Sequence, residues 1–290
     1  MSQVESFREQ AIENMFALPP FPLVFYKILD ITENTDGSRE ELLRALSLDQ
    51  AVVAKVLHIA NSAFYGLQKE VASIDRAVAL IGENMVRDVA IYCATNGLVQ
   101  RPLPRYGLSA TQFWEHSVAT SLAARCLAAR IIPQIREKAL VAGLLHDIGK
   151  LAMNGIIDLK SEVEIQNRLE QGRPLDEIEK EIFGIDHCEA GRLFADKWSF
   201  PDEIRDAIAL HHQPGQAGDH RHLVHLIQIA DKISHAFSAG IKMNEFLEIQ
   251  SNGPDWEDSI GSLGISRKDA ESLLSDVDAE LKGTEAFLNM

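Results

Sequence analysis

The pair of residues best suited to chemistry in this chain is His146 followed directly by Asp147, within the run 143–150 (Gly-Leu-Leu-His-Asp-Ile-Gly-Lys). Adjacent residues on a helix diverge by roughly 100° around its axis, so they seldom serve one small target together. They can serve two neighbouring metal ions if the carboxylate bridges both ions and the imidazole binds one. The apolar run before the pair predicts a buried helix, where an unpaired charge is costly and a partner or a metal is the usual remedy.

Five further candidate ligands lie on apolar faces of predicted helices: His116, His187, His211, His212 and Asp231. His116, for example, shares its face with Phe113, Ala119 and Ala123, at spacings typical of a core-facing helical residue. Taken singly, such a histidine is more often a hydrogen-bonded core residue than a ligand. Because the pattern recurs along the chain, we favour a common metal centre over seven separate core residues.

The donor types indicate which ions such a centre would hold. Neutral imidazoles and carboxylates suit borderline divalent metals, with Fe or Mn favoured and Zn or Ni also compatible, and no cysteine lies where a thiolate site would need it. Lys150 comes three residues after Asp147 and can point to the same side, so it either serves the site or is a solvated surface lysine. His220, His222 and His225 cluster on mixed helical faces, and we expect them to be exposed to solvent.

The elements that must position these residues are predicted to be helices. Helix-opening patterns occur at Ser38 with Glu41, Asp49, Ser73, Ser109 with Gln112, Asp186 with Glu189, and Ser266 with Asp269. Pro201 suits the first turn of the helix that ends in His211-His212. The segment 100–108 has two prolines and a glycine and breaks the helical pattern. Since no segment combines strand periodicity with hairpin signals, the predicted fold class is all-α.

The ordered histidines and aspartates resemble the HD superfamily of metal-dependent phosphohydrolases. The doubled histidine and His-Asp-Ile-Gly-Lys resemble its HD-GYP branch, which hydrolyses cyclic di-GMP. The amino-terminal half resembles the HDOD family, the HD-related output domain of bacterial signalling. Its marks are Leu-Pro-Pro-Phe-Pro at 18–22, Ser-Leu-Asp-Gln-Ala at 47–51 and Ile-Ala-Asn-Ser-Ala-Phe-Tyr-Gly-Leu at 59–67. The match runs from about Leu18 to about Phe237, so the chain is identified as an HDOD protein.

This resemblance implies a multi-helix HD-type bundle packed on an amino-terminal helical subdomain. The expected parts are residues 1–108 as the amino-terminal helical part, 109–240 as the HD-type metal-binding part and 241–290 as a carboxy-terminal helical extension. It further implies two divalent ions. One would be held by His116, His146, Asp147 and Asp231, and the other by His187, His211 and His212, with Asp147 shared.

Two functions follow from the resemblance. The first is a bacterial signal-transduction protein that works through a signalling protein partner and carries a dinuclear metal site. The alternative is a metal-dependent phosphohydrolase acting on a nucleotide or cyclic dinucleotide, in which Asp147 and Lys150 are catalytic and Lys150 helps bind phosphate. Two metal ions can activate water and stabilise charge on an attacked phosphate. Whether the chain is an enzyme stays open.

Departures from the catalytic branch favour the signalling function. Gln213 follows the doubled histidine where HD-GYP proteins usually have glutamate, and no Gly-Tyr-Pro occurs between Gly215 and Leu223. Gln112 stands one turn before His116, where some HD-GYP sites place a glutamate that recruits a third metal. We therefore expect no trinuclear site and have no reason to assume cyclic di-GMP as substrate.

Composition fits a cytoplasmic signalling protein. The net charge of −15 argues against binding a nucleic-acid backbone, although one pocket can still hold a small phosphorylated ligand. The polar start of the chain lacks a signal-type apolar region, and no apolar stretch is long enough to span a membrane. Three widely spaced cysteines provide no disulfide framework and suit a reducing compartment.

Overall fold

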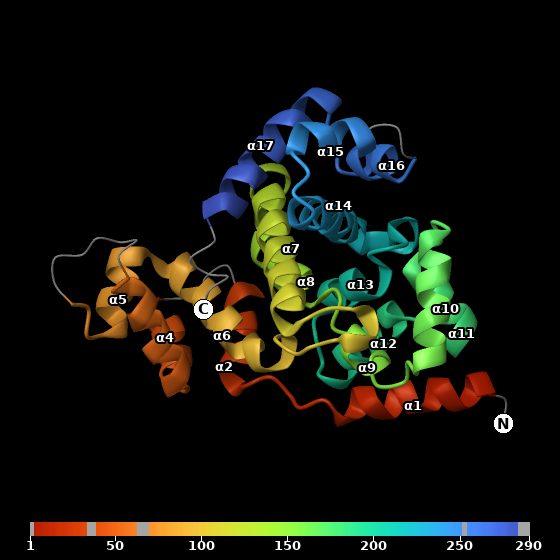
Figure 1. The fold of residues 1–290 in the computed structure, drawn as a ribbon. Helices are drawn as coiled ribbons and strands as arrows, with labels where there is room; N and C mark the ends of the chain where they lie inside the picture. Colours follow the sequence, from red (N-terminus) through yellow and green to blue (C-terminus); the bar gives the residue numbers. More distant parts are fainter. Residues whose placement is uncertain (1–2, 34–38, 63–69, 251–253, 284–290) are drawn as a thin grey trace. The chain divides into compact units, whose positions relative to one another are not determined.

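The computed structural model describes residues 3–33, 39–62, 70–250 and 254–283, and the regular structure in these ranges is helical (Figure 1). Within them an isolated bridge between Leu103 and Leu108 is the only β-type pairing. The predicted all-α fold class is confirmed. The contacts divide the chain into two compact units, Pro19–Gln100 and Met1–Leu18 with Arg101–Met290. The predicted division into residues 1–108, 109–240 and 241–290 rests on sequence patterns and not on contacts, so it stays a prediction.

The unit Pro19–Gln100 is built around one long helix, α6. Its helices are α2 (Leu23–Glu33), α3 (Arg39–Leu46), α4 (Gln50–Ala60), α5 (Ile74–Ile81) and α6 (Glu83–Val99). The other four all pack against α6. The predicted caps at Asp49 and Ser73 are confirmed, since each side chain accepts backbone N–H groups of the turn that follows. Ser38 and the end of the 59–67 motif fall outside the described residues.

The larger unit contains the predicted ligands. Its α-helices are α1 (Gln3–Ala17), α7 (Ala110–Ile131), α8 (Arg136–Leu145), α9 (Lys150–Met153), α10 (Leu159–Glu170), α11 (Leu175–Phe183), α12 (His187–Lys197), α13 (Asp202–Leu210), α14 (Arg221–Ser238), α15 (Met243–Gln250), α16 (Pro254–Ser262) and α17 (Arg267–Gly283). Short 3₁₀ turns link several of them: η2 (Pro104–Tyr106), η3 (Pro133–Ile135), η4 (Pro214–Gln216) and η5 (Gly218–His220).

Helices α7 and α8 form the centre of this unit and lie side by side (Figure 1). Their close approach needs Gly143, because a Cβ there would lie 2.7 Å from the Cα of Ser121 and 2.9 Å from the carbonyl oxygen of Thr120. Helices α13 and α14 pack on α8, and α12 packs on α13. All five of these helices, α7, α8, α12, α13 and α14, contain or adjoin the predicted ligands, so the packing of the core also fixes where those side chains meet.

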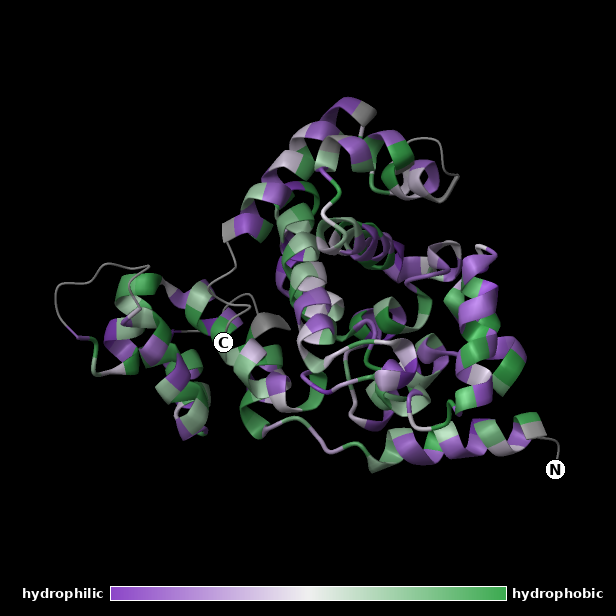
Figure 2. Cartoon of the chain, viewed as in Figure 1, coloured by the Kyte–Doolittle hydropathy of each residue, from purple (hydrophilic) through white to green (hydrophobic). Residues whose placement is uncertain are grey.

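Helix α1 packs on the outside of the same unit, against α9, α11 and α12. Hydrophilic and hydrophobic residues alternate along it, as expected for a helix with one buried face (Figure 2). Phe7 packs edge-on against Phe183, with ring centroids 5.3 Å apart, and Arg8 donates to the carbonyl oxygen of Gly184 and to Glu189. These contacts hold α1 on the helices that position His187 and Lys150.

Local sequence signals place most helix starts correctly. Ser109 and Gln112 form a full capping box at the start of α7, and Asp186 and Ser266 each accept the backbone N–H three residues on. The prediction for Pro201 is one residue off, because it is the N-cap of α13 and lies just before the first turn. None of the helices in the described ranges is both long and apolar enough to cross a membrane.

Candidate metal centre

His146 and Asp147 lie at a helix break, not within a helix as predicted. Helix α8 ends at Leu145, and the next four residues form a tighter turn before α9 begins at Lys150. In this turn the N–H of Ile148 donates to the carbonyl oxygen of Leu145 at 3.0 Å, and the N–H of Lys150 to that of Asp147 at 2.9 Å. Both side chains are fully buried, as the apolar run predicted.

The turn after Asp147 needs a glycine at position 149. A Cβ at this position would lie 1.8 Å from the carbonyl oxygen of His187 and 2.6 Å from the backbone nitrogen of Gly191. Backbone atoms cannot move aside as a flexible side chain can. The missing side chain therefore lets the His146-Asp147 turn pack directly on the first turns of α12, which brings His187 beside Asp147.

One group of donors gathers on α7, the α8–α9 turn and α14. The Nε2 atoms of His116 and His146 are 3.3 Å apart, and Oδ1 of Asp231 lies 3.1 and 3.4 Å from them. Oδ2 of Asp147 lies 3.7 Å from Nε2 of His116 and 3.5 Å from Nε2 of His146. Four predicted ligands therefore converge on one small volume.

A second group gathers on α12 and the end of α13. The Nε2 atoms of His187 and His212 are 3.1 Å apart. Oδ1 of Asp147 lies 3.6 Å from Nε2 of His187 and 3.8 Å from Nε2 of His211. The two carboxylate oxygens of Asp147 thus face two different sets of imidazoles. His187 and His211 are buried, whereas His212 is exposed to solvent.

Hydrogen bonds on the far side of each ring direct Nε2 toward the cluster. Nδ1 of His146 lies 2.8 Å from the carbonyl oxygen of Gly143, and Nδ1 of His211 lies 2.9 Å from that of Ile208. A carbonyl oxygen can only accept, so these Nδ1 atoms carry the proton and the neutral ring leaves Nε2 as a free lone pair. Metal-binding histidines are oriented by this kind of contact.

The ring of His116 is fixed by two hydroxyl groups. Thr120 donates to the carbonyl oxygen of His116 at 2.9 Å, so its own oxygen is left to accept from Ser234 at 2.7 Å. The carbonyl oxygen of Asp231, at 3.2 Å, is a second acceptor for the Ser234 proton, so with either acceptor that proton is engaged and the Ser234 oxygen accepts from Nδ1 of His116 at 2.8 Å. This assignment leaves Nε2 of His116 free to face Nε2 of His146.

Lys150 lies within the site. Its Nζ is 2.5 Å from Oδ2 of Asp147, and the residue is only 8% exposed, which excludes the solvated surface lysine. Burial by itself would raise the pKa of Asp147, but Lys150 and the surrounding imidazoles outweigh burial and hold that pKa well below its ordinary value. Asp147 is therefore a carboxylate at neutral pH.

The donor set fits divalent metal ions. Oδ1 of Asp147 and Oδ1 of Asp231 are buried and lack a hydrogen bond, although unpaired buried carboxylate oxygens are costly. Burial, with the neighbouring His212 and His146, lowers the pKa of His211 well below its ordinary value, so that ring is neutral and can donate a lone pair. A bound cation stabilises an arrangement in which the lone pairs of ring nitrogens face one another beside ionised carboxylates.

Three residues near the cluster were not among the predicted ligands. Glu179 is fully buried and its Oε2 lies 2.6 Å from Nδ1 of His187, while its Oε1 accepts from Tyr106 at 2.5 Å. Cys188 places its Sγ 3.8 Å from Nδ1 of His211, so the expectation that no cysteine lies where a thiolate ligand would be needed is wrong. Glu179 lies in a helix with many polar residues, and Cys188 is an isolated cysteine. No sequence pattern therefore marked either residue as part of the site.

The remaining histidines divide between surface and core. His220 is partly exposed and pairs with Asp206 at 2.6 Å. The expectation that His225 is exposed is wrong, because it is buried and its Nδ1 lies 3.0 Å from Oγ of Ser259 on α16. His235 is exposed, yet its Nε2 lies 3.4 Å from Oδ1 of Asp231. Only His235 of these three borders the donor cluster.

A cavity of about 610 Å³ opens beside the first group of donors. Its lining includes His116, Asp147 and Lys150, together with His235 and residues from both ends of the unit: Leu108, Gln112, Glu115, Ala119, Phe237, Ser238 and Leu281. Solvent and a small molecule can therefore reach this side of the cluster. The volume is in the range of ordinary ligand sites.

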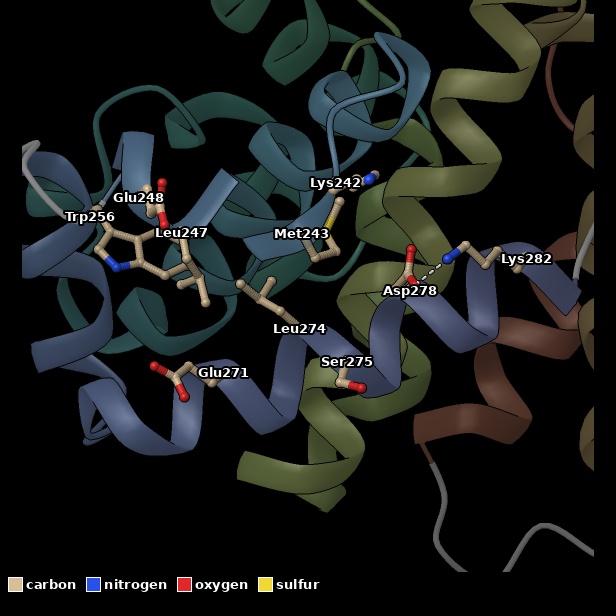
Figure 3. Close-up of a pocket in the computed structure, with 10 residues that line it drawn as sticks. All are labelled: Lys242, Met243, Leu247, Glu248, Trp256, Glu271, Leu274, Ser275, Asp278 and Lys282. Atoms are coloured by element: carbon tan, nitrogen blue, oxygen red, sulfur yellow. Dashed lines mark hydrogen bonds and ion pairs between the residues drawn. The ribbon is translucent and has the colours of Figure 1, made fainter. Parts of the chain in front are cut away.

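A second cavity, of about 570 Å³, lies among α15, α16 and α17 (Figure 3). Met243, Leu247 and Leu274 point into it beside the ring of Trp256, and charged side chains stand around the rim, including the ion pair of Asp278 with Lys282. No predicted ligand lines it. This cavity therefore belongs to the carboxy-terminal helices and not to the donor cluster.

Comparison with known proteins identifies the family. The HDOD domain model matches residues 18–214. An HDOD domain protein of unknown function from Geobacter sulfurreducens has a similar structure, with 25% identity, a TM-score of 0.75 and coverage of 99% of this chain and 98% of that chain. A protein from Shewanella amazonensis SB2B, named as a candidate phosphohydrolase, is also 25% identical, with a TM-score of 0.69 and coverage of 94% and 96%.

A curated relative from Treponema pallidum (strain Nichols), named only as an uncharacterized protein, is 25% identical over 218 residues. These residues are 74% of this chain and 41% of the relative, so the chain spans about two fifths of that protein's length. The family predicted from the motifs is confirmed. The chain belongs to the HDOD family.

Proposed function

We propose that this HDOD protein is a bacterial signal-transduction protein whose HD-type part holds two divalent metal ions. The observation that supports it most directly is the position of Asp147. One oxygen of its carboxylate faces His116 and His146, and the other faces His187 and His211. A carboxylate placed between two sets of imidazoles is the arrangement expected of a ligand shared by two ions.

The residues divide into two ligand sets. His116, His146, Asp231 and Oδ2 of Asp147 would hold one ion, and His187, His211, His212 and Oδ1 of Asp147 the other. Two bound ions would supply Lewis acidity toward a phosphate oxygen. The chain itself orients the ring nitrogens, and Lys150 neutralises part of the carboxylate charge.

The signalling function rests on the family and on the departures from the catalytic branch. The resemblance to the HDOD family implies that the chain acts through a signalling protein partner. Gln213 and the missing Gly-Tyr-Pro remove features of cyclic di-GMP hydrolases. In this function the metal centre stabilises the fold of the larger unit, because its ligands come from five separate segments of the chain.

The alternative, a metal-dependent phosphohydrolase, is supported by the cavity at His116, Asp147 and Lys150. Catalysis needs a site that a substrate can enter, and this cavity of about 610 Å³ provides one. A phosphorylated small molecule could place its phosphate near Lys150, whose ammonium is the one lysine or arginine cation among the described residues of the lining.

Metal analysis combined with a substrate screen tests both functions. We expect about two divalent ions per chain in the reconstituted protein, fewer in Asp147→Ala, and an unchanged number in Asp219→Ala, which alters an exposed carboxylate. A chain that binds no divalent ion contradicts the proposal. Turnover of a phosphodiester that Asp147→Ala abolishes establishes the hydrolase, whereas fully metallated protein without turnover supports the signalling module.

A further inference from the structure

We propose that Cys188 is an additional ligand of the ion held by His187, His211 and His212, and that it makes this position selective for thiophilic metals such as zinc. The inference rests on the proposed metal centre and specifies the chemistry of one of its two positions. It also departs from the preference for iron or manganese that the imidazoles and carboxylates alone suggest.

Cys188 occupies the position that such a ligand requires. It is the second residue of α12, directly after His187, and its side chain is buried. Sγ lies 3.8 Å from Nδ1 and 3.9 Å from Nε2 of His211. Sγ and one ring nitrogen each of His187, His211 and His212 all lie within 4.8 Å of one another.

A second observation indicates that this space suits a cation. Oδ1 of Asp147 is buried and has no hydrogen bond, and it lies 3.6 Å from Nε2 of His187 and 3.8 Å from Nε2 of His211. An anionic oxygen without a donor thus lies near Nε2 of His211, which Sγ of Cys188 also approaches. A buried free cysteine is ordinarily an apolar packing residue, but this one faces imidazoles.

The separations between these donors are close to those expected from zinc–nitrogen and zinc–sulfur bond lengths. With metal–nitrogen bonds of about 2.0–2.1 Å and a metal–sulfur bond of about 2.3 Å, neighbouring donors in a tetrahedral site are roughly 3.3–3.6 Å apart. The His187–His212 separation of 3.1 Å and the Cys188–His211 separation of 3.9 Å lie close to this range. Small side-chain rotations would close the difference.

Binding would proceed without a redox step. The ion replaces the thiol proton, which passes to solvent, and the sulfur lone pair forms the bond to the metal. Thiolate sulfur is a soft donor that favours zinc and cobalt over manganese. The other position has only imidazoles and carboxylates, so the two positions would differ in metal preference.

Cobalt(II) substitution tests the inference, because a thiolate bound to cobalt gives an intense near-ultraviolet charge-transfer band that imidazoles and carboxylates do not give. The chain offers two matched controls, Cys93→Ser and Cys126→Ser, which alter the other free thiols. We expect the band in wild type and in both controls, and its loss in Cys188→Ser. Cys188→Ala, which keeps a small apolar side chain, guards against a folding defect.

Competition with a chelator provides the second readout. We expect the affinity for zinc to fall at least about tenfold in Cys188→Ala, while the affinity for manganese changes little. Cobalt-loaded wild type without the band, or a band that persists in Cys188→Ala, overturns the inference and leaves the proposed metal centre intact. Failure of the wild type to bind cobalt, zinc or manganese would instead overturn the metal centre itself.

Discussion

Glu179 accepts two hydrogen bonds from a single residue, His187. The ring Nδ1 of His187 lies 2.6 Å from Oε2 of Glu179, and the backbone N–H of His187 donates to the same oxygen at 2.8 Å. The carboxylate thereby fixes both the first turn of α12 and the plane of the imidazole. His187 needs this support because a ring free to rotate about its side-chain bonds would lose its alignment with Asp147.

Replacing Glu179 with glutamine should weaken metal binding at the second position by about 10-fold to 100-fold. Glutamine keeps an acceptor oxygen but loses the negative charge that makes the imidazole a stronger donor. Isothermal titration with zinc measures the effect. Glu177→Gln is the control, since that side chain on the same helix is 57% exposed. Equal affinities in the two variants would contradict the role assigned to Glu179.

Gly149→Ala should destabilise the protein by about 3 kcal/mol or more, at the upper end of the range for overpacked sites. The new Cβ would meet the carbonyl oxygen of His187 and the backbone nitrogen of Gly191, which cannot rotate away. Chemical denaturation measures the loss. Gly261→Ala is the control, because a Cβ there meets nothing within 4 Å, and it should change stability by no more than about 1 kcal/mol.

Sequence reasoning was most successful where the information is local. The helical period places His116 and His187 on core-facing sides, and caps such as Asp186 fix where a helix begins, because both depend on residues within one or two turns. The structure brings all seven predicted ligands together. Their convergence was predicted from the recurrence of such residues on core-facing sides, but the division into two ligand sets came only from the resemblance, since spacing does not say which helices pack.

What the sequence could not supply depends on contacts between distant residues. Tyr106 reaches Glu179 across 73 positions, and no local pattern in either segment indicates that they meet. The break after Leu145 was missed because His146 and Asp147 continue an apolar helical run, and the tertiary contact at Gly149 decides the tighter turn. The burial of His225 depends on α16, a helix about thirty residues further along the chain.

Lys150→Met should destabilise the metal-free protein more than the metal-loaded protein. Without the ammonium, the buried Asp147 carboxylate loses its close cation, and breaking a buried ion pair typically costs about 3–5 kcal/mol. Bound ions would replace the lost positive charge, so saturating zinc or manganese should recover much of the difference in Tm. Thermal unfolding with chelator and with metal measures both states. An equal loss in both states would show that Asp147 does not contact an ion.

His225→Gln should make the stability of the protein less dependent on pH between about pH 7.5 and pH 5. Burial lowers the pKa of His225, and although Asp258 opposes this effect, the folded protein favours the neutral ring. A lowered folded-state pKa means that its contribution to stability is present above the unfolded pKa of about 6.5 and is lost as the pH falls through the folded value.

The contacts of His225 explain why protonation matters at this position. Ser259 donates its proton to Oε1 of Gln228 at 2.5 Å, so its oxygen accepts from Nδ1 of His225 and joins α14 to α16. The neutral ring already makes this bond, and the added charge would be buried between the two helices. The difference in Tm between wild type and His225→Gln, followed across the pH range, isolates this residue from the histidines of the metal centre. His58→Gln, which alters an exposed histidine of α4, is the control. A His225→Gln slope as steep as that of wild type would show that the buried ring does not couple folding to protonation.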